Sequence, residues 1–191
     1  MKIGLFFGSF NPIHVGDLII ANCMLEYSDL DEIWLVVSPQ NPLKKKSTLL
    51  NDYHRLEMVH LALKKYKKIK PCDIEFNLPK PSFTIDTLVH LKEKYPKNNF
   101  SLIMGMDNIE SLPKWKNYTQ IIENYSIFVY PRMDSTQVEL YNHKNIQLIK
   151  EVPIMEISST FIRKLIKEKK EYRHFLPSEV YNYIDKGNYY N

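Results

Sequence analysis

Glycine and cysteine are scarce in this 191-residue sequence, which contains five glycines and two cysteines. Cys23 and Cys72 form no close pair, which argues against a disulfide framework or a zinc ribbon and favours a reducing cytoplasm. No apolar run approaches the roughly 20 residues that span a bilayer. The first apolar residues lead straight into a turn and not into the cleavage site of a signal peptide. These absences predict a cytoplasmic protein with no membrane partner.

The composition is that of an ordinary globular chain, with 44% hydrophobic and 25% charged residues. The length predicts one domain over residues 1–191, with a small helical part at about 157–191. A net charge of +4 permits anionic substrates without requiring a nucleic acid. The lysines between 64 and 70 end a helix, where the dipole favours cations, so we expect no nucleic-acid partner. The sequence leaves open whether the chain forms a homo-oligomer.

Hydrophobic periodicity predicts strands that alternate with helices. Strands are expected at 2–7, 32–37, 70–76, 100–104, 126–130 and 145–152. Helices are expected at 15–27, 51–65, 84–94, 109–124 with a break at Pro113, 159–170 and 177–185, the last stopped by Gly187. The second helix would place Leu56, Val59, His60 and Leu63 on one face. The alternation predicts an α/β fold, a parallel sheet with helices on both faces, in which ligands bind beyond the carboxyl ends of the strands.

Two of the five glycines lie between the first strand and the first helix, in Gly8-Ser9-Phe10-Asn11-Pro12-Ile13-His14-Val15-Gly16-Asp17. Glycine lets the backbone turn tightly and approach a ligand closely. The free N–H groups of a helix start suit phosphate, and His14 can donate a hydrogen bond to a phosphate oxygen. A plain turn with a surface histidine explains the segment equally well, because single motifs often match by chance. The segment is neither a Walker A loop nor a dinucleotide fingerprint.

A second strand-to-helix segment carries hydroxyl groups and an arginine, in Glu156-Ile157-Ser158-Ser159-Thr160-Phe161-Ile162-Arg163. Ser158 or Ser159 can cap the helix, and the hydroxyls can bond phosphate oxygens. Arg163 lies one turn into the helix and can bind a phosphate as a planar fork. Taken alone, the segment is better explained by an ordinary cap and a solvated arginine.

Two further segments carry groups that suit a nucleotide. Gly105 permits close backbone approach, Asp107 can bind a ribose hydroxyl or a base amine, and Trp115 can stack on an aromatic ring. A capped helix and a half-buried tryptophan would also account for these residues. A stiff loop at 81–84 leads into a helix that would be capped by Ser82 or Thr84.

These segments form an ordered set of motifs along almost the whole chain. They are Gly8-Ser9-Phe10-Asn11-Pro12-x-His14-x-Gly16, Pro81-Ser82-Phe83-Thr84-x-x-Thr87-Leu88, Met104-Gly105-x-Asp107, Leu112-x-x-Trp115, Ile157-Ser158-Ser159-Thr160-x-x-Arg163 and Leu176-Pro177-x-x-Val180 to Tyr189. The first and fifth resemble the (H/T)xGH and IS(S/A)TxxR signatures of a nucleotidyltransferase superfamily. The others are similar, in order, to its bacterial nicotinate-nucleotide adenylyltransferase branch.

The resemblance implies a Rossmann-like, doubly wound α/β domain that joins ATP to nicotinate mononucleotide, giving deamido-NAD and pyrophosphate. Mg²⁺ would be bound mainly through phosphates, with no protein metal site. The catalytic positions would be His14, Asp17 and Arg163. ATP would be bound by Gly8, Ser9, Phe10, His14, Gly16, Gly105, Asp107, Ile157, Ser158, Ser159 and Arg163. The mononucleotide would be bound by Lys44, Ser82, Phe83, Thr84 and Trp115.

Two positions depart from the family pattern. The first signature ends in a second histidine, where this chain has Asp17, which repels anions and donates nothing when ionised. In the loop after the second strand the family often has a histidine, whereas this chain has Lys44-Lys45-Lys46, so Lys44 would reach the phosphates. Two alternatives stay open: a sister enzyme that uses nicotinamide mononucleotide, and a nucleotide-binding protein whose turnover is impaired by Asp17.

Overall fold

A parallel β-sheet forms the centre of the molecule. The computed structural model describes residues 1–39, 49–133 and 139–191. Within these residues, six parallel strands form one sheet in the order β3-β2-β1-β4-β5-β6. They are β1 (Lys2–Gly8), β2 (Glu32–Val37), β3 (Ile69–Cys72), β4 (Asn99–Gly105), β5 (Ile127–Tyr130) and β6 (Ile146–Leu148). This strand order is that of a Rossmann fold and confirms the expected architecture.

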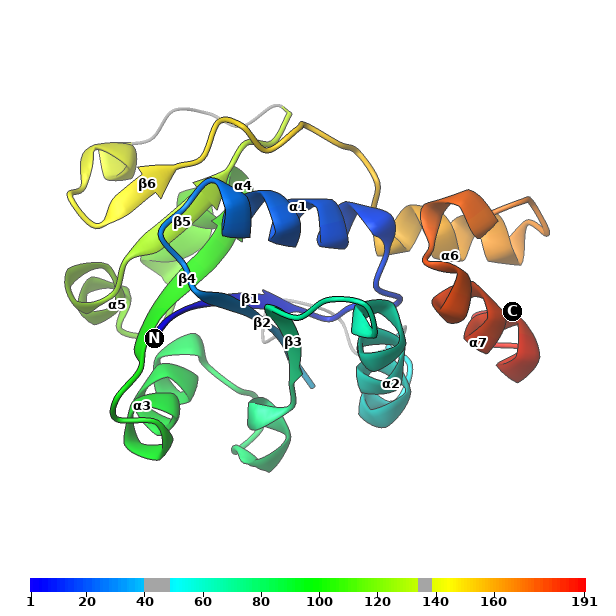
Figure 1. The fold of residues 1–191 in the computed structure, drawn as a ribbon, viewed down its shortest axis with the longest axis horizontal. Helices are drawn as coiled ribbons and strands as arrows, with labels where there is room; N and C mark the ends of the chain where they lie inside the picture. The colour runs from blue at the N-terminus through cyan, green and yellow to red at the C-terminus, as the bar shows by residue number, and fades with distance from the viewer. Residues whose placement is uncertain (40–48, 134–138) are drawn as a thin grey trace.

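Helices cover both faces of the sheet (Figure 1). They are α1 (Val15–Glu26), α2 (Asp52–Leu63), α3 (Thr84–Lys94), α4 (Met106–Ser111), α5 (Tyr118–Asn124), α6 (Ser159–Lys167) and α7 (Ser178–Gly187). One buried cluster packs α1, α2, α6 and α7 against one face of the sheet, and a second cluster packs α3 and α5 against the other. The fold is therefore doubly wound, as predicted.

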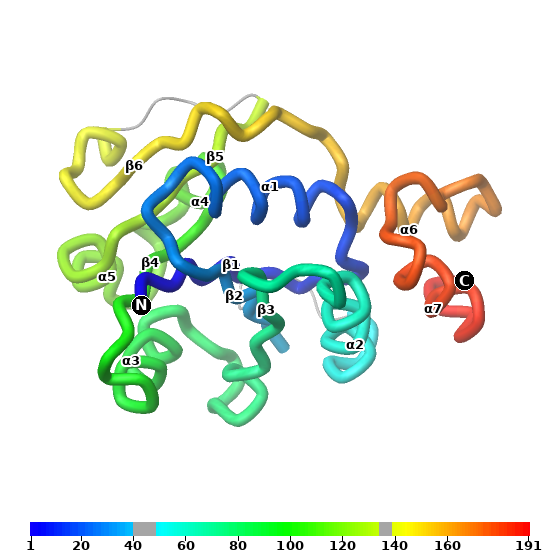
Figure 2. Tube along the Cα trace, in the orientation of Figure 1, coloured from blue at the N-terminus to red at the C-terminus, as the bar shows by residue number. Residues whose placement is uncertain are grey.

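The segment 149–158 connects β6 to α6 and runs along α1, as the tube in Figure 2 shows. Ile149 and Val152 are buried in the same cluster as the apolar residues of α1. The segment brings α6 and α7 to the end of the molecule where α1 begins, beside α2 (Figure 1). Two helix starts that are far apart in the sequence, those of α1 and α6, thereby become neighbours.

The two edge strands are shorter than the sequence predicts. β3 ends at Cys72, because the chain turns there into a 3₁₀ helix (Ile74–Asn77) that buries Ile74 and Glu75. β6 ends at Leu148, because its partner β5 ends at Tyr130 and is followed by Pro131, which cannot donate to the sheet. Apolar periodicity in both segments continued beyond the point where a partner strand was available.

The turn after β1 does not use its glycines in the way the sequence predicts. No described glycine has a positive φ, and the left-handed residue of the turn is Phe10, with a φ of 44°. Gly8 instead provides space, because a Cβ atom there would lie 2.6 Å from the Phe10 ring. A Cβ atom on Gly16 would lie 3.0 Å from His14 Nδ1. These glycines allow two rings to pack against the backbone.

Two helix termini also differ from the expected caps. The residue before α3 is Phe83, and no side chain caps this helix, so neither Ser82 nor Thr84 has the expected role. The last helix includes Gly187 and is ended by Asn188, whose φ of 51° is left-handed. Asparagine tolerates this conformation better than other residues that carry a Cβ atom.

Candidate active site

A cavity of about 640 Å³ lies where β1 and β4 end. The strand order reverses between these two strands, and ligands of open α/β sheets bind at such a point. Nine of the residues expected to bind ATP line this cavity: Gly8, Ser9, Phe10, His14, Asp107, Ile157, Ser158, Ser159 and Arg163. The fold thus gathers both predicted phosphate segments around one space.

The loop Gly8–His14, which is expected to bind phosphate and is called the phosphate loop below, enters α1 through a reciprocal cap. The backbone N–H of Asp17 donates to His14 Nδ1 at 3.3 Å, and the backbone N–H of His14 donates to Asp17 Oδ2 at 3.0 Å. Because Nδ1 accepts a hydrogen bond, the neutral imidazole carries its proton on Nε2. His14 therefore retains one ring donor for a ligand.

Asp17 lines the same cavity as His14. Its side chain is 15% exposed, and Oδ2 lies 3.4 Å from His14 Nδ1. The helix dipole favours a carboxylate in the first turn, and the cap satisfies one of the backbone donors that a helix start leaves open. The dipole and the cap therefore stabilise Asp17 at this position. An ionised carboxylate nevertheless repels an anionic ligand and has no proton to donate.

The start of α6 contacts the phosphate loop directly. Ser158 caps the helix by accepting from the backbone N–H of Phe161, and Ser159 Oγ donates to the Pro12 carbonyl at 2.8 Å. Arg163 Nη1 donates to the Asn11 carbonyl at 2.7 Å. Burial lowers the pKa of Arg163 from its ordinary value, but arginine stays charged in proteins. A positive charge therefore lies against the phosphate loop.

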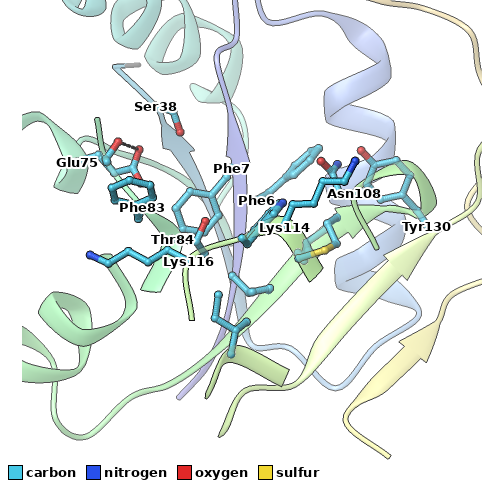
Figure 3. A pocket seen from close by; sticks show the side chains of 16 residues that line it. Phe6, Phe7, Ser38, Glu75, Phe83, Thr84, Asn108, Lys114, Lys116 and Tyr130 are labelled. Carbon is cyan, nitrogen blue, oxygen red and sulfur yellow. Dashed lines mark hydrogen bonds between the residues drawn. The ribbon is translucent and has the colours of Figure 1, made fainter. Parts of the chain in front are cut away.

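A second cavity, of about 200 Å³, is lined by the segments from which a mononucleotide site was expected (Figure 3). Ser82, Phe83 and Thr84 line it together with Trp115. The indole Nε1 of Trp115 is buried and has no hydrogen-bond partner among the described residues. Lys114 and Lys116 also line this cavity, with the Lys116 ammonium 4.8 Å from the centre of the Phe83 ring. Aromatic and cationic groups thus surround one space.

Glu75 lies in the wall of this second cavity and was not predicted from the sequence. It is 2% exposed, and its carboxylate accepts hydrogen bonds from Ser82 Oγ at 3.0 Å and Thr87 Oγ1 at 2.7 Å. These bonds tie the 3₁₀ helix after β3 to both sides of the start of α3. Glu75 therefore fixes the position of this helix start. No side chain caps the start, so its first N–H groups are not bonded to a capping side chain.

The two cavities adjoin each other. Five residues line both of them: Phe6, Phe7, Ser38, Asn108 and Tyr130. Burial raises the pKa of Tyr130 to about 12, so its hydroxyl is neutral at physiological pH. Two ligands, one in each cavity, would meet across this shared wall.

Comparison with known proteins agrees with the motifs. The sequence profile of the cytidylyltransferase-like family matches residues 5–165. A probable nicotinate-nucleotide adenylyltransferase of Flavobacterium johnsoniae is 61% identical, over 100% of this chain and 99% of the relative. The chain belongs to this adenylyltransferase family. A family member from Bacteroides thetaiotaomicron is 44% identical, over 96% of this chain and 91% of its own length.

Solved structures of the adenylyltransferase family share this fold. Nicotinic acid mononucleotide adenylyltransferase of Plasmodium falciparum, solved in complex with NaAD, has a TM-score of 0.82 at 21% identity, over 99% of this chain and 97% of that one. A putative nicotinate-nucleotide adenylyltransferase of Vibrio parahaemolyticus has a TM-score of 0.72 at 20% identity, over 99% and 94%. At these identities the likeness establishes the fold alone.

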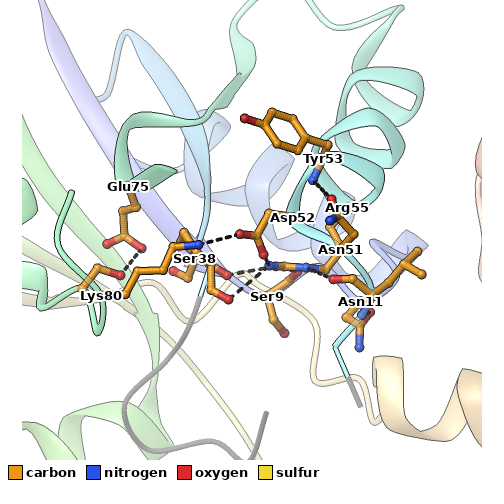
Figure 4. A network of polar contacts seen from close by, with 12 residues as sticks. Ser9, Asn11, Ser38, Asn51, Asp52, Tyr53, Arg55, Glu75 and Lys80 are labelled. Carbon is orange, nitrogen blue, oxygen red and sulfur yellow. Dashed lines mark hydrogen bonds and ion pairs between the residues drawn. The ribbon is translucent and has the colours of Figure 1, made fainter. Parts of the chain in front are cut away.

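A buried arginine connects the loops of this family member and was missed in the sequence. Arg55 is fully buried, and its guanidinium donates to the carbonyls of Ser9 at 2.6 Å, Ser38 at 2.9 Å and Leu50 at 2.9 Å (Figure 4). It also pairs with Asp52 at 2.6 Å. The predicted buried face of α2 was therefore wrong in part, because Arg55 is inside and His60 is exposed.

The other predicted site residues are less directly placed: two glycines lie behind the cavity walls, Asp107 lies at the edge, and Lys44 is not among the described residues. Gly16 and Gly105 are buried next to the cavity residues His14 and Tyr130. The side chain of Asp107 is 62% exposed, with Oδ1 3.8 Å from Arg132 Nε. Lys44 lies outside the described residues. Within those residues, no helix is long and apolar enough to cross a membrane, and no group of three or more His, Cys, Asp or Glu could hold a metal ion.

Proposed function

We propose that this chain transfers the adenylyl group of ATP to nicotinate mononucleotide, with deamido-NAD and pyrophosphate as products. The observation that carries this proposal is the pair of adjoining cavities at the switch point of the sheet. The cavity of about 640 Å³, called the ATP cavity below, is surrounded by two helix starts and an arginine, which suits a triphosphate. The cavity of about 200 Å³, called the mononucleotide cavity below, contains Trp115 and two lysines, which suits an anionic aromatic ring.

The reaction needs positioning more than covalent chemistry. A phosphate oxygen of the mononucleotide attacks the α-phosphorus of ATP in line, and the bond from that phosphorus to the pyrophosphate oxygen breaks. No covalent enzyme intermediate is required. Catalysis of this kind comes from orienting the two reactants and from stabilising the charge that develops. The cavities support this arrangement, because five residues line both of them and ligands in the two cavities would lie next to each other.

On the ATP side, we assign His14 Nε2 and the start of α1 to the α- and β-phosphates. Ser158 and Arg163 would hold the β- and γ-phosphates and the departing pyrophosphate. The hydroxyl hydrogen of Ser159 already bonds the Pro12 carbonyl, so this serine would act by holding the phosphate loop. The adenosine would lie against Asp107 and the backbone of Gly105. Gly8, Ser9, Phe10 and Ile157 would complete the walls.

On the mononucleotide side, Trp115 would stack on the pyridine ring. The uncapped start of α3, at Thr84, would accept the carboxylate, with Ser82 and Phe83 holding that start in place. Lys114 would add positive charge, and Lys116 would add less because its ammonium pairs with Asp86 at 2.9 Å. Lys44 stays a proposal made from the sequence.

Mg²⁺ would accompany ATP and neutralise phosphate charge. Within the described residues, Asp17 and Asp107 are the carboxylates that line the ATP cavity. Asp17 is engaged in the cap of α1, so Asp107 together with the substrate phosphates would form the ligand set, which is a usual one for Mg²⁺. Because Cys23 and Cys72 are both free thiols, we also propose that the chain works in a reducing compartment such as the cytoplasm.

The first test is the choice between acid and amide. We expect kcat/KM for nicotinate mononucleotide to exceed that for nicotinamide mononucleotide by about 10- to 100-fold, because charged hydrogen bonds to a carboxylate are worth about 1.5–3 kcal/mol. Pyrophosphate release from ATP with each nucleotide measures this ratio. Lys116→Met should lower it, whereas Lys92→Met, at the far end of α3, should not. Equal turnover with both nucleotides would instead support the amide-using sister enzyme.

A second prediction concerns Arg163. We expect Arg163→Lys to lower kcat/KM for ATP by about 10- to 100-fold, because lysine cannot reproduce the two-pronged contact of a guanidinium with phosphate. Steady-state kinetics at varied ATP measure this loss, and Arg173→Lys, outside both cavities, is the matched control. An unchanged dependence on ATP would restrict Arg163 to its contact with the Asn11 carbonyl.

A further inference from the structure

The segment that follows α7, residues 188–191, returns to the phosphate loop. Two of its residues have left-handed backbones, Asn188 with a φ of 51° and Tyr190 with a φ of 71°. A bulky side chain is rarely found in this conformation, and such a backbone persists only where its surroundings hold it. Tyr190 packs against the core cluster, and its hydroxyl donates to Oδ1 of Asn11, 179 positions away in the sequence, at 2.8 Å.

Asn11 is the residue of the phosphate loop on which several segments converge. It is 1% exposed and lines the ATP cavity. Its Oδ1 also accepts from the backbone N–H of Leu50 at 3.1 Å, just before α2, and its carbonyl accepts from Arg163 Nη1 at 2.7 Å. The preceding residue, Phe10, has a left-handed backbone of its own. The shape of the loop therefore depends on contacts that come from outside it.

The Tyr190 hydroxyl is suited to this contact. Burial raises its pKa above the ordinary tyrosine value, and the nearby guanidinium groups of Arg163 and Arg55 only partly oppose that effect. The hydroxyl therefore stays protonated and can donate throughout the physiological pH range. The same two arginines contact the phosphate loop through the Asn11 and Ser9 carbonyls.

We propose that Tyr190 is a positioning residue for ATP: its hydrogen bond to Asn11 holds the phosphate loop in the shape that receives the triphosphate. This inference rests on the function proposed above, because it assigns the Gly8–His14 loop to ATP. The mononucleotide cavity shares five lining residues with the ATP cavity, but none of them belongs to the Gly8–His14 loop, and Tyr190 does not line it. The effect of losing the contact should therefore fall on one substrate alone.

The experiment compares Tyr190→Phe with Tyr189→Phe. Both variants remove one hydroxyl from neighbouring tyrosines, but the Tyr189 hydroxyl lies 3.3 Å from His54 Nδ1, away from the loop. We expect Tyr190→Phe to raise the KM for ATP about 3- to 10-fold, the effect of one lost hydrogen bond, with the KM for the mononucleotide unchanged. Tyr189→Phe should change neither KM. Titration calorimetry with ATP should show the same loss of affinity in Tyr190→Phe.

Two outcomes would overturn the proposal. In one, the KM for ATP in Tyr190→Phe stays at the value of the unaltered chain. In the other, both KM values and the melting temperature change alike in the two variants, which is a general loss of stability and not positioning. If the unaltered chain releases no pyrophosphate with any mononucleotide, the proposed function is wrong. The calorimetric comparison then still decides whether Tyr190 positions the nucleotide-binding loop.

Discussion

Asp17→His is expected to raise the turnover number by about 10²- to 10³-fold, the usual effect of one hydrogen-bond donor placed where charge develops. The carboxylate of Asp17 lines the cavity proposed for ATP and lies 3.4 Å from His14 Nδ1, so a histidine side chain at this position would also lie at that cavity. It would also remove a negative charge that repels the phosphates. Steady-state pyrophosphate release from the two versions measures the gain.

The same substitution should lower stability slightly. Asp17 Oδ2 accepts from the backbone N–H of His14, and the loss of that bond should cost about 1 kcal/mol of unfolding free energy. Glu26→His makes the same chemical change at the exposed end of α1 and should leave turnover unaltered. If the Asp17 chain already turns over as fast as its histidine version, the donor to the phosphates comes from elsewhere, and Lys44 becomes the first candidate.

Arg55→Leu should lower the free energy of unfolding by about 3–5 kcal/mol, because it leaves several backbone carbonyls around a buried side chain without their donor, at about 1–3 kcal/mol each. The partners here are Asp52 and four carbonyl oxygens, at Ser9, Ser38, Pro39 and Leu50. Urea unfolding measures the change as a lower midpoint at constant slope.

Lys80→Met is the control for that loss. The Lys80 ammonium binds the other oxygen of Asp52 at 2.9 Å, but its side chain is 47% exposed, so its loss should cost at most about 1 kcal/mol. Equal effects of Arg55→Leu and Lys80→Met would mean that the buried guanidinium does not hold the loops together.

The central part of the fold follows from local sequence. Strands buried on both faces read as continuous apolar runs, and their alternation with helical segments leaves a parallel sheet as the natural arrangement. The limits of β3 and β6 do not follow in this way, because a strand at the edge ends where its partner ends. The placement of His14 follows from the general rule that ligands bind at the carboxyl ends of parallel strands. Arg163 reaches the same cavity because the 149–158 segment carries α6 from the edge strand β6 to the start of α1, which the rule does not predict.

Polar residues that act across long sequence distances could not be predicted. A charged residue on an amphipathic helix is normally placed on the outside, and only the carbonyls of distant loops explain why Arg55 is inside. Its one local signal is Asp52, three positions earlier on the same face. Glu75 gave no such signal, since its partners Ser82 and Thr87 lie across a turn whose path the sequence does not show. Phe10 occupies a left-handed position that residue preferences assign to glycine.

The wall shared by the two cavities has a consequence for the product. A dinucleotide formed there is a bivalent ligand, because each of its linked halves occupies one cavity. When one half is bound, the link holds the other half at a high effective concentration beside its own cavity. It should bind more tightly than either substrate without making a new contact, whereas pyrophosphate carries no such tether. In the Asp17→His chain, departure of the dinucleotide should limit the rate, and a burst of pyrophosphate should precede the steady state.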